Sequence, residues 1–108
     1  MKIISTKDGV TLTVQLLGEL DHHAARNAIM HLGNTIDLEL PGKTILDLSG
    51  LSFMDSSGIA VIINLFRRMQ ELGGDFEISK VPVQAEKVIN AAGLNKIIKI
   101  NTEKKINV

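Results

Sequence analysis

The chain has 108 residues with 12 basic and 12 acidic side chains, so it lacks the excess of Lys and Arg that is typical of nucleic-acid-binding domains. Hydrophobic residues make up 44% and charged residues 22%, which is typical of a globular domain with one hydrophobic core. The sequence contains no cysteine, which excludes disulfides, thiolate metal ligands and thiol nucleophiles.

The N-terminal residues predict a β-hairpin. The segments "KIIST" and "VTLTVQLLG" (residues 2–6 and 10–18) alternate apolar with polar or β-branched residues, and the turn signal "KDG" separates them. This alternation places four apolar side chains on one face of the second strand: Val10, Leu12, Val14 and Leu16. We expect "GEL" to end the strand, so that Asp21 stands at the N-cap of a helix.

Two amphipathic helices with a short strand between them are expected next. Apolar residues at helical spacing predict a first helix that ends before Pro41, with its stripe at Ala25, Ala28, Ile29, Leu32, Thr35 and Ile36. The segment "TILDLSG" (residues 44–50) reads as a buried strand, and "LSFMD" (residues 51–55) as a connector. Ser56 or Ser57 opens the second helix, which ends at the glycine pair 73–74 and has its predicted core stripe at Ile59, Ile62, Ile63, Phe66 and Met69.

The remaining segments complete an α/β pattern. We expect a strand at residues 75–79, a shorter helix at residues 83–93 and a last short strand at residues 96–100. The order β-β-α-β-α-β-α-β predicts a mostly parallel sheet with an antiparallel hairpin at its start. In such a sheet the loops after parallel strands emerge at one edge, where binding sites form. The segments "GELDHH" and "LSFMDSSG" should therefore share one surface.

The "DSSG" motif does not have the spacing of a hydrolase. A nucleophile elbow needs a glycine two residues before the serine and another two residues after it. Met54 and Asp55 occupy the preceding positions for Ser56 and Ser57, and no histidine follows the motif, because the last one is His31. Acyl-transfer catalysis is therefore disfavoured, and we predict that the chain is not an enzyme.

The adjacent histidines do not form a metal motif. His22 and His23 point to different sides of a helix and cannot jointly bind a metal ion from one face. They are expected to be solvated first-turn residues that can make polar contacts at the loop edge. We therefore predict no metal and no cofactor.

Two interpretations of Ser56 stay open on local chemistry. An Asp or a Ser before an apolar helix is commonly an N-cap, and this interpretation is favoured by the residue pattern. A helix start also tolerates a phosphate, which adds a charge of about −1.5 to −2 and would make a surface next to Asp21 and Asp55 strongly anionic. Such a change would weaken the binding of a partner that buries this surface.

Three segments carry a family resemblance: "LLGELDHHAAR", "ILDLSGLSFMDSSGIAVIINLFRRMQELGG" and "AAGLNKIIKI". Together they resemble the anti-sigma-factor antagonists of the STAS-domain family, of the sporulation and general-stress type. The resemblance implies one STAS domain over residues 1–108, with a mostly parallel mixed sheet of four to five strands flanked by three to four helices. The family pattern "SSGLGVIL" is here "SSGIAVII", in which Ala60 replaces a glycine and adds a methyl near the expected docking face.

The resemblance also implies a function. In this family the unphosphorylated antagonist binds an anti-sigma factor that is also a serine kinase, a GHKL-type ATPase, and so frees a sigma factor. The kinase phosphorylates the serine directly after the aspartate, here Ser56, and a PP2C-type serine phosphatase restores the binding form. The expected binding face consists of Asp21, Asp55, Ser56, Ser57 and Gly58, with His22 at its edge, and Ser57 is expected to be structural. No nucleic acid or membrane partner is expected, and the expected compartment is the cytoplasm, because the N-terminus lacks the apolar stretch of a secretory signal.

One alternative keeps the fold but changes the role. The chain could be a STAS scaffold or a transporter-associated interaction module, in which Ser56 only caps its helix. Phosphorylation of Ser56 distinguishes the two interpretations.

Overall fold

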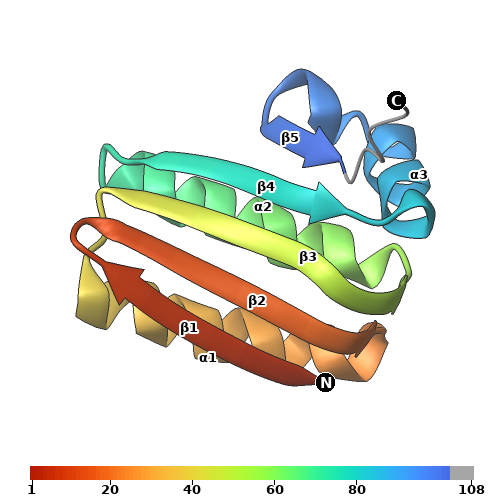
Figure 1. Cartoon of the computed structure of the whole chain (residues 1–108), viewed down its shortest axis with the longest axis horizontal. Coiled ribbons are helices and arrows are strands. Elements are labelled where there is room, and N and C mark those ends of the chain that lie inside the picture. Colours follow the sequence, from red (N-terminus) through yellow and green to blue (C-terminus); the bar gives the residue numbers. More distant parts are fainter. Residues whose placement is uncertain (103–108) are drawn as a thin grey trace, which may run out of the picture.

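The computed structural model describes residues 1–102 as an α/β fold around one five-stranded sheet (Figure 1). The elements follow in the order β1 (Lys2–Asp8), β2 (Thr11–Leu20), α1 (His22–Glu39), β3 (Lys43–Met54), α2 (Ser57–Glu71), β4 (Asp75–Val81), α3 (Val83–Ala91), a short 3₁₀ helix η1 (Leu94–Lys96) and β5 (Lys99–Thr102). The strand order in the sheet is β1-β2-β3-β4-β5, with β1 antiparallel to β2 and all other pairs parallel. This confirms the predicted parallel sheet with an antiparallel hairpin at its start.

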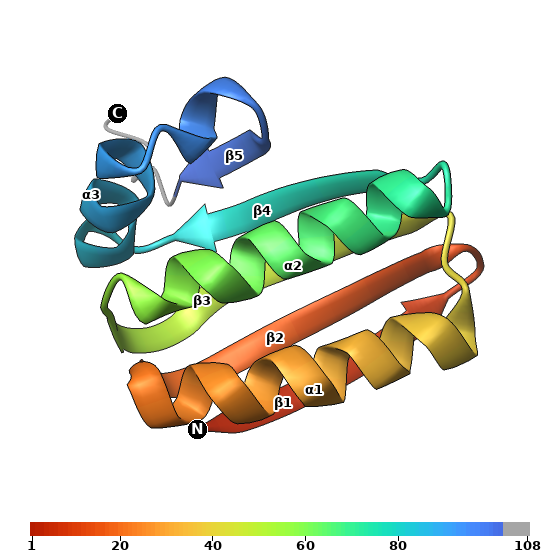
Figure 2. The same ribbon diagram turned by 180° about the vertical axis from the view of Figure 1, so that it is seen from behind.

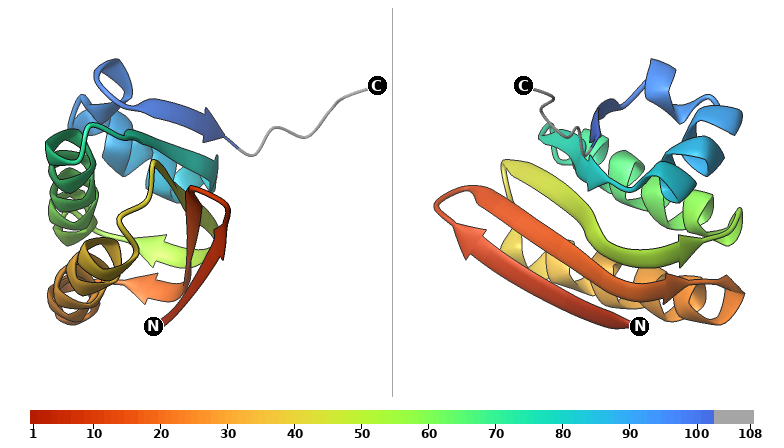
Figure 3. Two further views of the ribbon diagram at one scale, coloured as in Figure 1. Left: turned by 90° about the vertical axis from the view of Figure 1, so that its left-hand side faces the viewer. Right: turned by 45° about the vertical axis from the view of Figure 1, so that its right-hand side comes forward.

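Helices α1 and α2 cover the same face of the sheet. Figure 2 shows them side by side over this face, and the left view of Figure 3 shows the opposite face without a helix over its centre. A parallel connection is almost always right-handed, so successive strands added in one direction place their helices on one side. The core lies in this layer, with fully buried side chains from both strands and helices: Leu12, Val14, Leu16, Leu46, Leu48, Leu32, Ile36, Ile62 and Leu65.

The hairpin differs from the prediction in two places. Val10 is 69% exposed because it lies in the turn between β1 and β2, where its carbonyl accepts the N–H of Gly42. The expectation that "GEL" ends the second strand was wrong, because β2 continues to Leu20. Register shifts on both sides of Gly18 mark bulges, and Gly18 has a φ of +104°, which a residue with a side chain rarely adopts.

The expectation that "LSFMD" is a connector was also wrong. β3 runs through this segment to Met54, because Gly50, Phe53 and Met54 pair with the extended end of β2. Met54 lies opposite Leu20, so the two strands end side by side. These two extensions bring the loops that follow them to the same place.

The stripe predicted for α1 is confirmed at Ala25, Ala28, Leu32 and Ile36, with Ile29 and Thr35 half-buried. The stripe predicted for α2 was rotated about the helix axis. The buried residues are Gly58, Val61, Ile62, Leu65 and Met69. Ile59, Ile63 and Phe66 are half-buried, because they lie on the flank of the helix, where Phe66 contacts Phe76 of β4.

The sheet face away from α1 and α2 carries a charged cluster. Lys43 of β3 forms an ion pair of 2.6 Å with Glu77 of β4, and Asn101 of β5 donates a hydrogen bond of 2.9 Å to the same carboxylate. The hydrogen bond from Lys43 lowers the pKa of Glu77 and raises the pKa of Lys43. The pair therefore keeps Glu77 ionised although this side chain is only 10% exposed. Within residues 1–102, no helix has the length and apolar composition needed to span a bilayer.

Candidate functional site

The loops after β2 and β3 start next to each other at one edge of the sheet. Leu20 and Met54 are paired, and the N–H of Asp55 donates to the carbonyl of Leu20 over 3.3 Å. Asp21 and Asp55 follow these two strand ends directly. The predicted meeting of "GELDHH" and "LSFMDSSG" at one edge is therefore confirmed.

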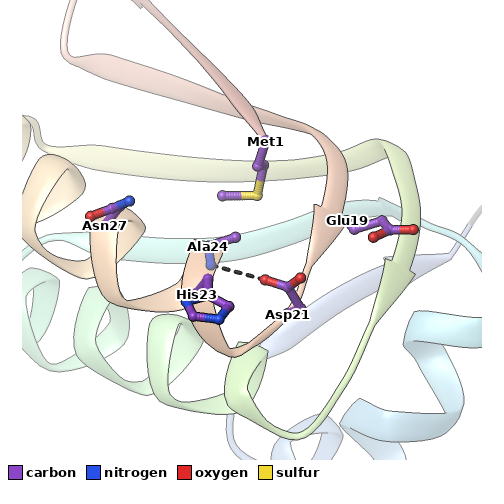
Figure 4. A pocket seen from close by; sticks show the side chains of 6 residues that line it. All are labelled: Met1, Glu19, Asp21, His23, Ala24 and Asn27. Carbon is purple, nitrogen blue, oxygen red and sulfur yellow. Dashed lines mark hydrogen bonds between the residues drawn. The ribbon is translucent and has the colours of Figure 1, made fainter.

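Asp21 is the N-cap of α1, as the sequence predicted. Its Oδ1 accepts the backbone N–H of Ala24 over 3.0 Å, and this hydrogen bond lowers the pKa of the Asp21 carboxyl (Figure 4). The carboxylate also borders an open hollow of about 490 Å³ lined by Met1, Glu19, Asp21, His23, Ala24 and Asn27. Asp21 thus fixes the helix start while its carboxylate stays charged at the surface.

The start of α2 is capped by Asp55 and not by Ser56. The backbone N–H of Ser57 donates to Oδ1 of Asp55 over 2.8 Å, and the N–H of Gly58 donates to the carbonyl of Asp55. Ser56 occupies the N-cap position, yet its side chain makes no capping hydrogen bond and the residue is exposed. The interpretation of Ser56 as a capping serine, which the residue pattern favoured, is therefore wrong.

This geometry predicts different stabilities for two alanine variants. Ser56→Ala should change the free energy of unfolding by less than about 0.5 kcal/mol, because it removes no hydrogen bond of the helix start. Asp55→Ala should lower it by about 1 kcal/mol, because the N–H of Ser57 loses its acceptor. Urea unfolding followed by circular dichroism measures both values. Equal losses in the two variants would contradict this assignment of the cap.

The two serines of the motif line different hollows. Ser57 lies in a hollow of about 220 Å³ between α1 and α2, lined by His22, Ala25, Arg26, Ile29, Ser57 and Ala60. Ser56 lies in a hollow of about 490 Å³ between α2 and α3, lined by Ser56, Ile59, Lys87, Val88, Ala91 and Ala92. Ser57 is half-buried and its N–H is held by Asp55, whereas Ser56 is exposed. The structure therefore separates a half-buried serine from an exposed one.

Five of the six predicted binding residues reach the surface at this edge: Asp21, His22, Asp55, Ser56 and Ser57. Gly58 is buried instead, because α2 approaches β3 closely at this point. A Cβ at position 58 would lie 2.6 Å from Cγ of Met54 and 3.0 Å from Cδ2 of Leu20. Gly58 therefore supports the binding face from below and does not form part of its surface.

The sequence did not predict the residues that α3 and the flank of α1 contribute to this edge. Lys87 lines the same hollow as Ser56, Arg26 lines the same hollow as Ser57, and Gln84 is hydrogen-bonded to the backbone of Met54. Lys87 and Gln84 lie about 30 residues after the motif, and only the packing of α3 against the end of β3 brings them close. No spacing in the sequence signals this contact.

The rings of His22 and His23 lie 6.0 Å apart, centroid to centroid, in an edge-to-face arrangement at this edge. His22 lines the hollow that contains Ser57, whereas His23 lines the hollow next to Asp21. Within residues 1–102 there is no group of three or more His, Asp or Glu side chains that could hold a metal ion. The edge thus presents hydroxyl, carboxylate and imidazole groups at the surface.

Comparisons with known proteins give a consistent result. The family model of the STAS domain matches residues 2–106. The anti-sigma F factor antagonist of Paenibacillus polymyxa is 34% identical over 89 residues, which cover 82% of this chain and 76% of that protein. The solved structure of the anti-sigma factor antagonist SpoIIAA in its unphosphorylated form has a TM-score of 0.80 and 26% identity, covering 94% of this chain and 90% of that one. The Bacillus cell fate determinant SpoIIAA in its phosphorylated form has a TM-score of 0.72 and 26% identity, covering 94% and 93%.

Proposed function

Because this chain belongs to the anti-sigma-factor antagonists of the STAS-domain family, we propose that it is a binding switch controlled by phosphorylation of Ser56. Its unphosphorylated form binds an anti-sigma factor and so releases a sigma factor. The phosphorylated form no longer binds. The protein itself performs no catalysis and needs no cofactor.

The exposed, uncapped hydroxyl of Ser56 is the observation that carries this proposal. A kinase requires an accessible acceptor, and Ser56 is exposed while Asp55 alone caps the helix. Replacement of the Ser56 hydroxyl proton by a phosphoryl group therefore breaks no hydrogen bond of the helix start. A phosphate adds a charge of about −1.5 to −2 next to Asp55 and Asp21, so a partner that fits the neutral hydroxyl meets a strongly anionic surface.

The resemblance and the comparisons support the partners that we propose. The anti-sigma factor is a serine kinase of the GHKL ATPase type, and a PP2C-type phosphatase removes the phosphate from Ser56. The name of the Paenibacillus relative supports an anti-sigma factor as the partner, and the solved phosphorylated form of SpoIIAA supports control by phosphorylation. The classes of the kinase and the phosphatase follow from the family resemblance. The switch acts in the cytoplasm, where sigma factors act, in a sporulation or general-stress response.

Phosphate mapping tests the proposal. The protein is incubated with ATP and the anti-sigma-factor kinase of the same cell, and the modified position is identified by mass spectrometry. We expect one phosphate on Ser56, none in Ser56→Ala, and an unchanged Ser56 signal in the matched variant Ser57→Ala. Phosphate on another residue with Ser56 unmodified would refute the site. If the protein neither binds the anti-sigma factor nor accepts a phosphate, the result would favour a STAS scaffold or a transporter-associated module.

A further inference from the structure

Helix α3 is attached to the end of β3, next to the loop that carries Ser56. Oε1 of Gln84 accepts the N–H of Met54 and Nε2 of Gln84 donates to its carbonyl, both over 2.8 Å. β4 pairs with β3 only as far as Asp47 opposite Ser79, so the Gln84 amide takes the place of a neighbouring strand at Met54. These two hydrogen bonds hold the first turn of α3 against Met54, which lies two residues before Ser56 in the chain.

The hydrogen bonds between Gln84 and Met54 also determine where Lys87 lies. It lies three residues after Gln84, about one helical turn further along the same side of α3, and it lines the hollow that contains Ser56. The other residues of this hollow are apolar: Ile59, Val88, Ala91 and Ala92. Within residues 1–102, the five ion pairs do not include Lys87, and this side chain is exposed. Its ammonium is therefore available to an anion that forms at Ser56.

We propose that Lys87 binds the phosphate carried by Ser56 and so compensates part of its charge within the same chain. The inference rests on the proposed function, because it takes Ser56 as the acceptor. A Lys ammonium binds a phosphate as a point charge at the end of a flexible stem, which can reach across an open hollow. The phosphate and the Lys87 ammonium then both occupy the hollow between α2 and α3. Phosphorylation thus changes the shape of the α3 side of the binding face as well as its charge.

The other charged groups around position 56 come from three elements. Asp55 directly precedes Ser56, Glu86 lies in α3 beside Lys87, and Asp21 starts α1 at the same edge. These three carboxylates disfavour the doubly charged phosphate. His22 and Arg26 line the hollow on the other side of the α2 start, with Ser57. Lys87 is therefore the cation that shares a hollow with Ser56, and its removal should be visible in the titration of the phosphate.

A ³¹P titration tests this inference independently of the kinase. Phosphoserine is inserted at position 56 of the full chain during synthesis by a reassigned codon, and the ³¹P shift is followed from pH 4 to pH 9. Lys87→Ala should raise the midpoint of the second phosphate ionisation by about half a pH unit, as expected for one partly exposed ion pair. Lys87→Arg should restore the original midpoint. Lys96→Ala, which removes an exposed lysine of η1 outside this hollow, should leave it unchanged.

An identical midpoint in the parent protein and in Lys87→Ala would overturn the pairing. An equal rise in Lys96→Ala would overturn it as well, because the effect would then come from net charge. Since the phosphate is installed without a kinase, these outcomes do not depend on which residue the kinase modifies. The phosphate mapping above decides that separate question.

Discussion

Ser56→Asp should weaken binding of the anti-sigma factor by about 30-fold or more while the protein stays folded. The substitution places a carboxylate at an exposed position beside Asp55 and Asp21. A partner that fits the neutral hydroxyl must desolvate the new charge without offering a cation of its own, which costs about 2 kcal/mol or more at an interface. The N-cap position itself tolerates Asp, because carboxylates are favoured at helix starts. Isothermal titration calorimetry with the unmodified anti-sigma factor measures the dissociation constant.

Ser5→Asp is the matched control. Ser5 is an exposed serine in the middle of the edge strand β1, so this variant gains the same charge away from the loops after β2 and β3. Its affinity should stay within about twofold of the parent protein. Ser56→Ala should bind like the parent protein and resist phosphorylation. Equal affinities of Ser56→Asp and Ser56→Ala would refute the switch.

Leu20→Ala should lower the free energy of unfolding by about 3 kcal/mol. Leu20 is fully buried at the end of β2, and its Cδ2 lies against Gly58 at the start of α2. Removal of a buried leucine side chain loses its transfer free energy and leaves a cavity, which together cost about 2–5 kcal/mol. The cavity lies under the binding face, so the variant tests whether this edge depends on the core for its support. Urea unfolding gives the value.

Leu38→Ala provides the comparison for this measurement. Leu38 is 83% exposed on α1, so its truncation should change the free energy of unfolding by less than about 0.5 kcal/mol. A loss in Leu20→Ala as small as in Leu38→Ala would mean that the end of β2 is not packed as described. A large loss in both variants would point to an interaction of α1 that its exposure does not reveal.

Element order and sheet direction could be predicted because they depend on patterns within short segments. The alternation in "VTLTVQLLG" and the helical spacing from Ala25 to Ile36 are properties of one element each. The structure confirms the alternation from Leu12 to Leu16, and it confirms the helical spacing. The predicted ends of β2 and β3 were wrong, because a glycine in a sequence is typical of the end of a strand. In the structure Gly18 and Gly50 lie within bulged pairing between the two strands, which only the partner strand can show.

The site shows the same division between local and long-range information. The N-cap at Asp21 was predicted correctly, because it depends only on this residue and on the helix that directly follows it. The sequence left the cap of α2 open between an Asp and a Ser, because Asp55 and Ser56 are both good capping residues and only the geometry decides for Asp55. The position of Lys87 could not be predicted, since nothing near it in sequence indicates that it lines the same hollow as Ser56.

The strand order in space repeats the strand order in the chain, from β1 to β5. Each β–α unit therefore adds to the unit made before it, and a ribosome that releases the chain from its N-terminus can complete the sheet progressively. Asp21 and Ser56 belong to adjacent early units, so their shared edge can form before α3 is synthesised. Lys87 belongs to α3, the last α-helix within residues 1–102. A substitution at position 87 would thus alter the proposed counter-charge without altering the segment that carries Ser56.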